Sequence, residues 1–203
     1  MRHSVAAGAT PHENGNFRAL LGTRLGVPTI LLVGLNAQLT LWAFSAPGGP
    51  SISVFLYLGL GWSCLGAYWL FRLVGALWVD GFQPVLSKWR WWVLPPIAAL
   101  VTATLLVTDA PFRARFALSR SAMNSVAQEM VRDPTPPYPG RVGLYPVRRV
   151  EAFDEGMRFL VTGAGFVDPA GFAYSPQGEP PNIGGEDRYW HLEGPWYQWE
   201  ESW

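Results

Sequence analysis

The residues best suited to chemistry in this 203-residue chain are a histidine and a carboxylate near its C-terminus. His191 and Glu193 are two positions apart, so on a β-strand both side chains would share a face and could form an acid–base pair. A catalytic triad would also need a serine nucleophile, and none of the serines after residue 118 stands in a nucleophile-elbow motif. A structural or exposed His191 is the simpler interpretation, and we predict that the protein is not an enzyme.

Metal and nucleic-acid chemistry have weaker support still. The single cysteine, Cys64, lies in a hydrophobic run, and no cluster of Cys and His has the spacing of a zinc site. The acidic residues Asp168, Glu186, Asp187 and Glu193 match no calcium-binding loop. Basic residues form no patch of the size that nucleic acid requires. We therefore expect no cofactor, no metal, no disulfide within the chain and no nucleic-acid partner.

Aromatic residues with acids between them dominate the last 15 residues of the chain. Such a mixture is typical of surfaces that bind a glycan or a partner protein. Packing of about half of these rings into the core of a small sheet is an equally good interpretation. The candidate partner-binding residues are Trp190, His191, Trp196, Tyr197 and Trp203.

Three hydrophobic runs precede this region and predict transmembrane helices at about 25–44, 52–79 and 91–108. Each is near or above the roughly 20 residues needed to cross a hydrocarbon core of about 30 Å. Trp89, Trp91 and Trp92 form a cluster typical of the membrane interface. Residues 1–24 are polar and aperiodic, which predicts a disordered cytoplasmic tail. A cleaved signal peptide is the alternative for the first run, because Ala43-Phe44-Ser45 resembles a cleavage site.

Polar and small residues inside the runs predict contacts between helices. Asn36 and Gln38 would form hydrogen bonds with another helix, and Gly59, Ser63 and Ala67 recur every four residues, which permits close approach. Arg72 is predicted to extend toward the lipid headgroups. The alternative is a transport or ligand site that uses Asn36, Gln38 and Arg72.

Charge predicts the orientation of the chain in the membrane. Residues 1–108 carry six basic and two acidic groups, whereas residues 109–203 carry nine basic and 13 acidic groups. Near the spans, five Lys and Arg residues lie on the N-terminal side against three on the other side. The positive-inside rule therefore predicts a cytoplasmic N-terminus and an extracytoplasmic C-terminal domain.

Residues 109–203 predict a small α+β domain. An apolar stripe at helical spacing, comprising Phe112, Phe116, Met123, Val126 and Met130, predicts an amphipathic helix that starts near Pro111. A proline-rich linker at 133–140 follows, and then short antiparallel strands at 142–153, 157–162, 172–174 and 189–199. The predicted fold is thus three transmembrane helices followed by one amphipathic helix on a sheet of four or five antiparallel strands.

Segments 140–145, 171–176 and 191–197, the last reading His-Leu-Glu-Gly-Pro-Trp-Tyr, resemble segments of small actinobacterial membrane proteins to which no function is assigned. The resemblance covers roughly residues 111–199. It implies a shared fold and a location in the cell envelope, and it implies no reaction, ligand or catalytic residue.

The expected function is that of an integral membrane protein of the bacterial cell envelope, acting as an interaction or scaffold protein. Its expected partners are the lipid bilayer and either another membrane protein or cell-wall glycan. The alternatives are an accessory subunit or carrier within a membrane complex and, third, an extracytoplasmic enzyme.

Overall fold

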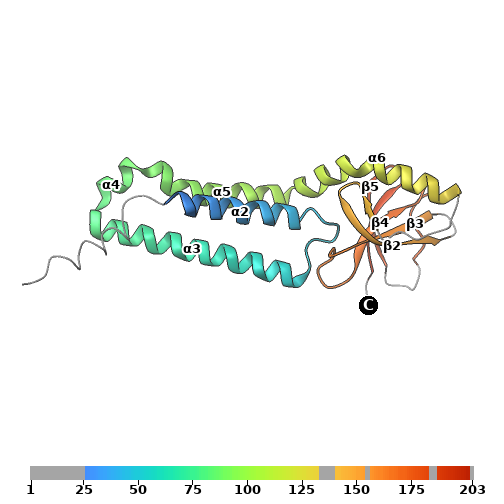
Figure 1. The fold of residues 1–203 in the computed structure, drawn as a ribbon, viewed down its shortest axis with the longest axis horizontal. Coiled ribbons are helices and arrows are strands. Elements are labelled where there is room, and N and C mark those ends of the chain that lie inside the picture. The colour runs from blue at the N-terminus through green and yellow to red at the C-terminus, as the bar shows by residue number, and fades with distance from the viewer. Residues whose placement is uncertain (1–25, 133–139, 154–155, 183–186, 202–203) are drawn as a thin grey trace, which may run out of the picture.

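The protein is described from a computed structural model in which residues 26–132, 140–153, 156–182 and 187–201 are defined. The chain is elongated, with a bundle of helices at one end and a sheet domain at the other (Figure 1). The bundle contains α2 (Val27–Ala43), α3 (Ile52–Asp80), α4 (Phe82–Ser87) and α5 (Trp89–Val107). The predicted tail 1–24, the linker at 133–139, Glu186 and Trp203 lie outside the described residues.

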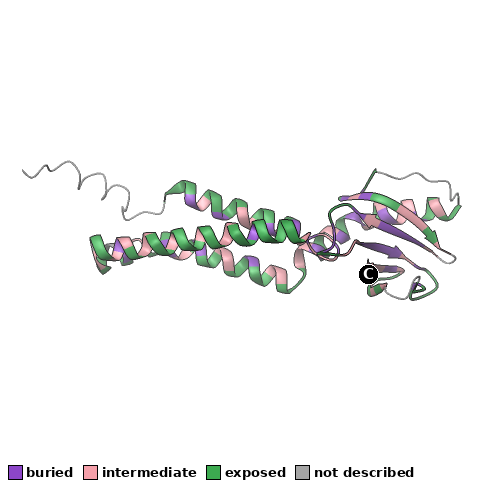
Figure 2. Cartoon of the chain, turned by 90° about the horizontal axis from the view of Figure 1, so that it is seen from below, coloured by how far each residue is buried: buried purple, intermediate pink, exposed green. Residues whose placement is uncertain are grey.

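Two helices of the bundle, α3 and α5, are long and apolar enough to cross a membrane, and α2 is a shorter apolar helix of 17 residues. The outer faces of all three expose large hydrophobic side chains, such as Leu31 and Leu70 (Figure 2). α2 packs against both α3 and α5. Because exposed leucines are costly in water and harmless in hydrocarbon, these faces suit a lipid environment.

Pro95 and Pro96 lie inside α5, which begins at Trp89. A proline has no backbone N–H, so Pro96 leaves the carbonyl of Trp92, four residues earlier, without its helical donor. The indole Nε1 of Trp69 on α3 donates to that carbonyl at 3.0 Å. A neighbouring helix thus satisfies the carbonyl, as an apolar environment requires.

The amphipathic helix is present as α6 (Ala110–Arg132), and it follows α5 after a break at Asp109, whose φ is 52°. Phe112, Phe116 and Met123 are buried, and Val126 and Met130 are partly buried. The predicted apolar stripe is therefore confirmed, and it faces the sheet.

The sheet is antiparallel and has six strands within the described residues. These are β1 (Gly140–Val142), β2 (Tyr145–Phe153), β3 (Gly156–Val161), β4 (Ala170–Tyr174), β5 (Arg188–Glu193) and β6 (Trp196–Glu200). They are ordered β1-β2-β3-β4-β6-β5, so β1 and β5 are the edges. α6 lies along one face (Figure 1).

The sheet has six strands in place of the predicted four or five. Gly143 lies between β1 and β2 with φ 59°, and Gly194 lies between β5 and β6 with φ 57°. Each is the first of two loop residues, the position at which a type II′ turn requires a glycine. The predicted strand 189–199 is therefore a hairpin, and β1 begins at Gly140, the last residue of the predicted linker.

The core of the domain lies between α6 and the sheet. Phe159, Phe172 and Trp196 are fully buried there. The rings of Phe116 and Phe172 have centroids 5.5 Å apart, and those of Phe159 and Trp196 are 5.6 Å apart. Aromatic packing of this kind lets a small domain without disulfides form a stable core.

Candidate functional site

The loop between α2 and α3 joins the helical bundle to the sheet domain. Pro50 forms an antiparallel β-bridge with Ala164. The Gly165 N–H donates to the Gly49 carbonyl at 3.0 Å, and the Ile52 N–H donates to the Phe166 carbonyl at 2.9 Å. Residues 45–51 are therefore fastened to the loop between β3 and β4 of the sheet domain.

One arginine on α6 fastens the same loop to the sheet. Arg115 Nη1 donates to Ser45 Oγ at 2.9 Å, and its Nη2 donates to the Leu144 carbonyl at 2.6 Å. The guanidinium carbon lies 4.4 Å from the ring centroid of Tyr145. Burial lowers the pKa of Arg115 and raises the pKa of the Tyr145 hydroxyl. These contacts hold the domain in one orientation relative to the helices.

Gly48 makes this close approach possible. Its φ is 67°, and a Cβ atom at this position would lie 2.7 Å from the Cβ of Ala170 and 3.1 Å from the Cα of Gly165. Both the backbone conformation and the lack of space therefore require glycine.

A cleft of about 680 Å³ lies between this loop, the first turns of α6 and strand β5. We call it the junction groove, and its defining residues are Phe44, Gly48, Asp109, Arg113, Trp190 and Glu193. Trp190 is 44% exposed and supplies an aromatic surface. Arg113 is exposed, whereas Glu193 forms an ion pair with Arg120 at 2.6 Å. The groove thus offers the exposed aromatic side chain of Trp190, the partly buried ring of Phe44 and both signs of charge.

His191 and Glu193, which strand alternation would place on one face, do not form an acid–base pair. A register shift between them disrupts the strand alternation, as a β-bulge does, so the two side chains have different neighbours. The His191 ring packs edge-on against Tyr197, with centroids 5.0 Å apart, and its Nε2 lies 2.9 Å from the Gly194 carbonyl. Glu193 instead contacts Arg120 on α6.

The other aromatic candidates are split between surface and core. Trp196 is fully buried and donates from Nε1 to Asn124 Oδ1 at 2.7 Å, so it is unavailable to a partner. Tyr197 is half-buried and Trp190 is exposed. Of the predicted binding residues, Trp190 and His191 line the junction groove.

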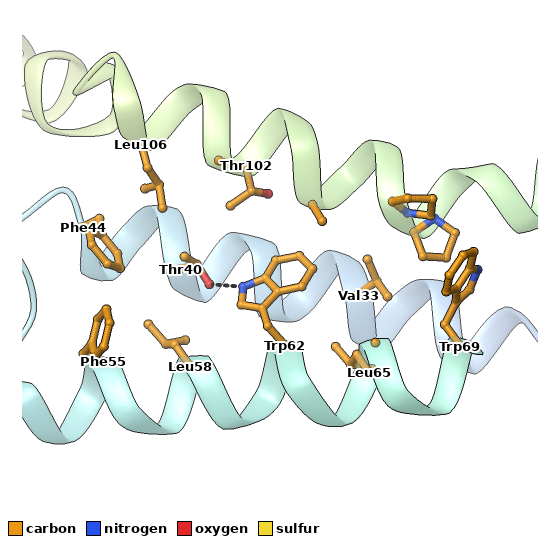
Figure 3. Close-up of a pocket in the computed structure, with 16 residues that line it drawn as sticks. Val33, Thr40, Phe44, Phe55, Leu58, Trp62, Leu65, Trp69, Thr102 and Leu106 are labelled. Atoms are coloured by element: carbon orange, nitrogen blue, oxygen red, sulfur yellow. Dashed lines mark hydrogen bonds between the residues drawn. The ribbon is translucent and has the colours of Figure 1, made fainter. Parts of the chain in front are cut away.

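A second cavity, of about 560 Å³, lies within the bundle between α2, α3 and α5 (Figure 3). We call it the helix cavity, and its defining residues are Phe44, Phe55, Trp62, Trp69, Pro95 and Leu106. Its lining is almost entirely apolar. Trp62 Nε1 donates to Thr40 Oγ1 at 3.1 Å, and Thr102 Oγ1 donates to the Ala98 carbonyl at 2.8 Å, so these polar atoms already have partners.

The two spaces are neighbours, because Phe44 lines both of them. Leu106 of the helix cavity and Asp109 of the junction groove are three residues apart where α5 passes into α6. An apolar space in the bundle is therefore adjacent to a groove with polar and charged side chains beside the sheet. Sequence reasoning missed both, because no local pattern marks a space between distant segments.

The predicted contact residues in the bundle have mixed positions. Asn36 lies against Gly61, where a Cβ would be only 2.6 Å from Asn36 Oδ1, and Gly59 lines the helix cavity. Gln38, Ser63 and Ala67 are exposed on outer faces. Arg72 has its guanidinium 6.0 Å from the Tyr68 ring centroid. Neither Asn36 nor Arg72 is among the residues that line the helix cavity.

The sheet face away from α6 carries a buried ion pair. Arg158 and Asp187, whose side chains are 8% and 4% exposed, are 2.7 Å apart. Asp187 also accepts from Trp199 Nε1 at 3.0 Å, and Arg158 donates to the Tyr189 hydroxyl. This network joins β3 to the start of β5, which indicates a structural role.

Among the described residues, no group of three His, Cys, Asp or Glu side chains could hold a metal ion. Comparisons with protein-family models, curated proteins and solved structures find no match for this chain.

Proposed function

We propose that this chain is a multi-pass membrane protein of the bacterial cell envelope that acts by binding. In this proposal the spans at about 25–44, 52–79 and 91–108 cross the cytoplasmic membrane, the N-terminus is cytoplasmic and the sheet domain is extracytoplasmic. The excess of Lys and Arg near the spans on the N-terminal side supports this orientation. The resemblance to actinobacterial membrane proteins supports the location.

The observation that carries the proposal is the attachment of the domain to the bundle. Two backbone hydrogen bonds, a β-bridge and the Arg115 contacts fix the loop after α2 to the sheet. The junction groove lies beside the transition from α5 to α6, where a membrane surface would lie. A site held at a fixed height above the bilayer suits recognition of a partner that is itself in or on the membrane.

Binding is favoured over catalysis because the candidate acid–base residues are otherwise engaged. The nearest partner of His191 Nε2 is a backbone carbonyl, and Glu193 is paired with Arg120. Neither is aimed at the other, so the geometry of general acid–base catalysis is missing at this pair.

Two measurements in cells test the proposal. A periplasm-type reporter and a cytosol-type reporter are each fused after Trp203, and activity of the cytosolic reporter alone would refute the orientation. A photo-reactive benzoylphenylalanine is then placed at Trp190, with a matched control at Leu118, which is 75% exposed on α6. We expect a discrete crosslinked product from position 190 and none from position 118. Equal, diffuse labelling at both positions would count against a binding role for the groove.

The second candidate function is an accessory subunit of a membrane complex. The exposed polar and small side chains of Gln38, Ser63 and Ala67 on the outer faces of the bundle favour it. Crosslinking from Ser63 tests this alternative: capture of a defined membrane protein supports it, and capture of lipid alone contradicts it.

A further inference from the structure

We propose that the helix cavity and the junction groove form one site for a phosphate-bearing membrane lipid. One hydrocarbon chain occupies the helix cavity, and the phosphate lies in the junction groove at Arg113. This inference rests on the proposed placement of the bundle in a membrane, and it names the ligand class of the proposed binding site.

The shape of the helix cavity selects a hydrocarbon chain over a helix. Its lining runs from Phe55 to Trp69 along α3, about 21 Å at a rise of about 1.5 Å per residue. A volume of about 560 Å³ over that length leaves a mean cross-section of about 27 Å². A transmembrane helix with a diameter of about 10 Å needs about 80 Å². A single extended hydrocarbon chain is the thinner object that fits.

The chemistry of the helix cavity agrees with this occupant. Its few polar atoms are already satisfied within the bundle, since Trp62 bonds to Thr40 and Thr102 bonds to its own helix. The polar groups of Trp62, Thr40 and Thr102 are thus not left to recognise a ligand, so binding in the helix cavity is by apolar burial alone. Discrimination between ligands must therefore come from the part of the site outside the bundle.

The junction groove supplies that discrimination. Arg113 is its exposed cation, on the first turn of α6, and a guanidinium forms strong paired hydrogen bonds to phosphate. The two carboxylates of the groove are Asp109 and Glu193, and Arg120 neutralises Glu193. Asp109 would repel a phosphate, so the phosphate lies against Arg113. Trp190 then covers the rest of the headgroup.

The adjacency of the two spaces is the reason for treating them as one site. Phe44 lines both spaces, and Leu106 and Asp109, one from each lining, are three residues apart. An amphiphile is the ligand class that needs an apolar slot and a polar groove in this order. Its chain would be parallel to the helices and its headgroup would be level with the start of α6.

Native mass spectrometry of the full chain in detergent tests the proposal with two probes, dioleoylphosphatidylglycerol and dioleoylglycerol, which differ in the phosphate. Ala103→Phe places a ring in the helix cavity, and Ala67→Phe is its matched control on an outer face. Arg113→Gln removes the cation from the groove. Arg148→Gln, at an exposed position of β2, is its matched control. Circular dichroism verifies that each variant keeps its helix and strand content.

We expect the unmodified chain to retain one phosphatidylglycerol, held at least about tenfold more tightly than the diacylglycerol. Ala103→Phe should weaken both lipids by about tenfold or more, because it displaces several buried methylenes. Arg113→Gln should remove only the preference for phosphate. Unchanged retention by folded Ala103→Phe, or an unchanged preference in Arg113→Gln, would overturn the proposal. Because these outcomes do not depend on the reporter fusions, failure here leaves the proposed orientation intact.

Discussion

The orientation of the sheet domain depends on Arg115, and its removal is the most informative perturbation. Arg115→Ala deletes two hydrogen bonds from a charged donor, to Ser45 and to the Leu144 carbonyl. At about 1.5 kcal/mol each, with about 0.5 kcal/mol from the contact with Tyr145, the loss is about 3.5 kcal/mol. About 1.5 kcal/mol of that loss falls on the bond to Ser45, which is the contact that ties the bundle to the domain.

Spin labels measure the consequence directly. One label is attached to the single native cysteine, Cys64, which is exposed on α3, and the other to Val167→Cys, in the exposed loop before β4. In the unmodified protein we expect a narrow distribution of distances between the labels. Arg115→Ala should broaden it and lower the melting temperature of the domain in detergent.

Two further variants separate charge from geometry. Arg115→Lys keeps the charge but lacks the fork that reaches two acceptors, so it should recover only about half of the lost stability. Arg113→Ala, on the exposed side of the same helix, should leave the distance distribution unchanged. If Arg115→Ala is folded and gives a distribution as narrow as the unmodified protein, the argument that this arginine holds the domain in place is wrong.

Three other perturbations have expected outcomes. Asp187→Ala leaves Arg158 buried without its counter-charge, so the free energy of unfolding should fall by about 3–5 kcal/mol in a guanidinium titration, and the additional change Arg158→Met should recover part of it. Trp69→Phe removes the donor to the Trp92 carbonyl, so the free energy of unfolding in detergent should fall by about 1–2 kcal/mol. An unchanged free energy of unfolding would show that this hydrogen bond does not stabilise the bundle. Burial raises the pKa of Tyr189 to about 12, from ~10 in the unfolded chain. The stability contributed by its neutral hydroxyl is complete below pH ~10 and is lost as the pH rises through about 12, so Tyr189→Phe should flatten alkaline unfolding over that window.

Local patterns predicted the elements whose residues are close in sequence. The apolar stripe from Phe112 to Met130 predicted α6 and the face it buries, because helical periodicity depends only on neighbouring residues. The lengths of the hydrophobic runs predicted where α3 and α5 begin and end to within two residues. The turn signal at Asp168 to Gly171 predicted the return into β4.

Predictions failed where one residue changes the geometry of its neighbours. Gly194 turns the predicted strand 189–199 into a hairpin, and a positive φ at a glycine is not visible in the hydrophobic pattern. The register shift between His191 and Glu193 interrupts the alternation that would place both side chains on one face.

The amino-acid sequence by itself determined the order of apolar helices and sheet, the amphipathic α6 and the balance of charge across the chain, since each follows from composition or from periodicity over a few turns. Only the tertiary structure decided that residues 45–51 bond to the loop between β3 and β4, that Arg115 reaches Ser45 across 70 positions, and that Phe44 lines both the helix cavity and the junction groove. These features are contacts or spaces between segments far apart along the chain. Their existence depends on how the elements pack, which no local pattern records.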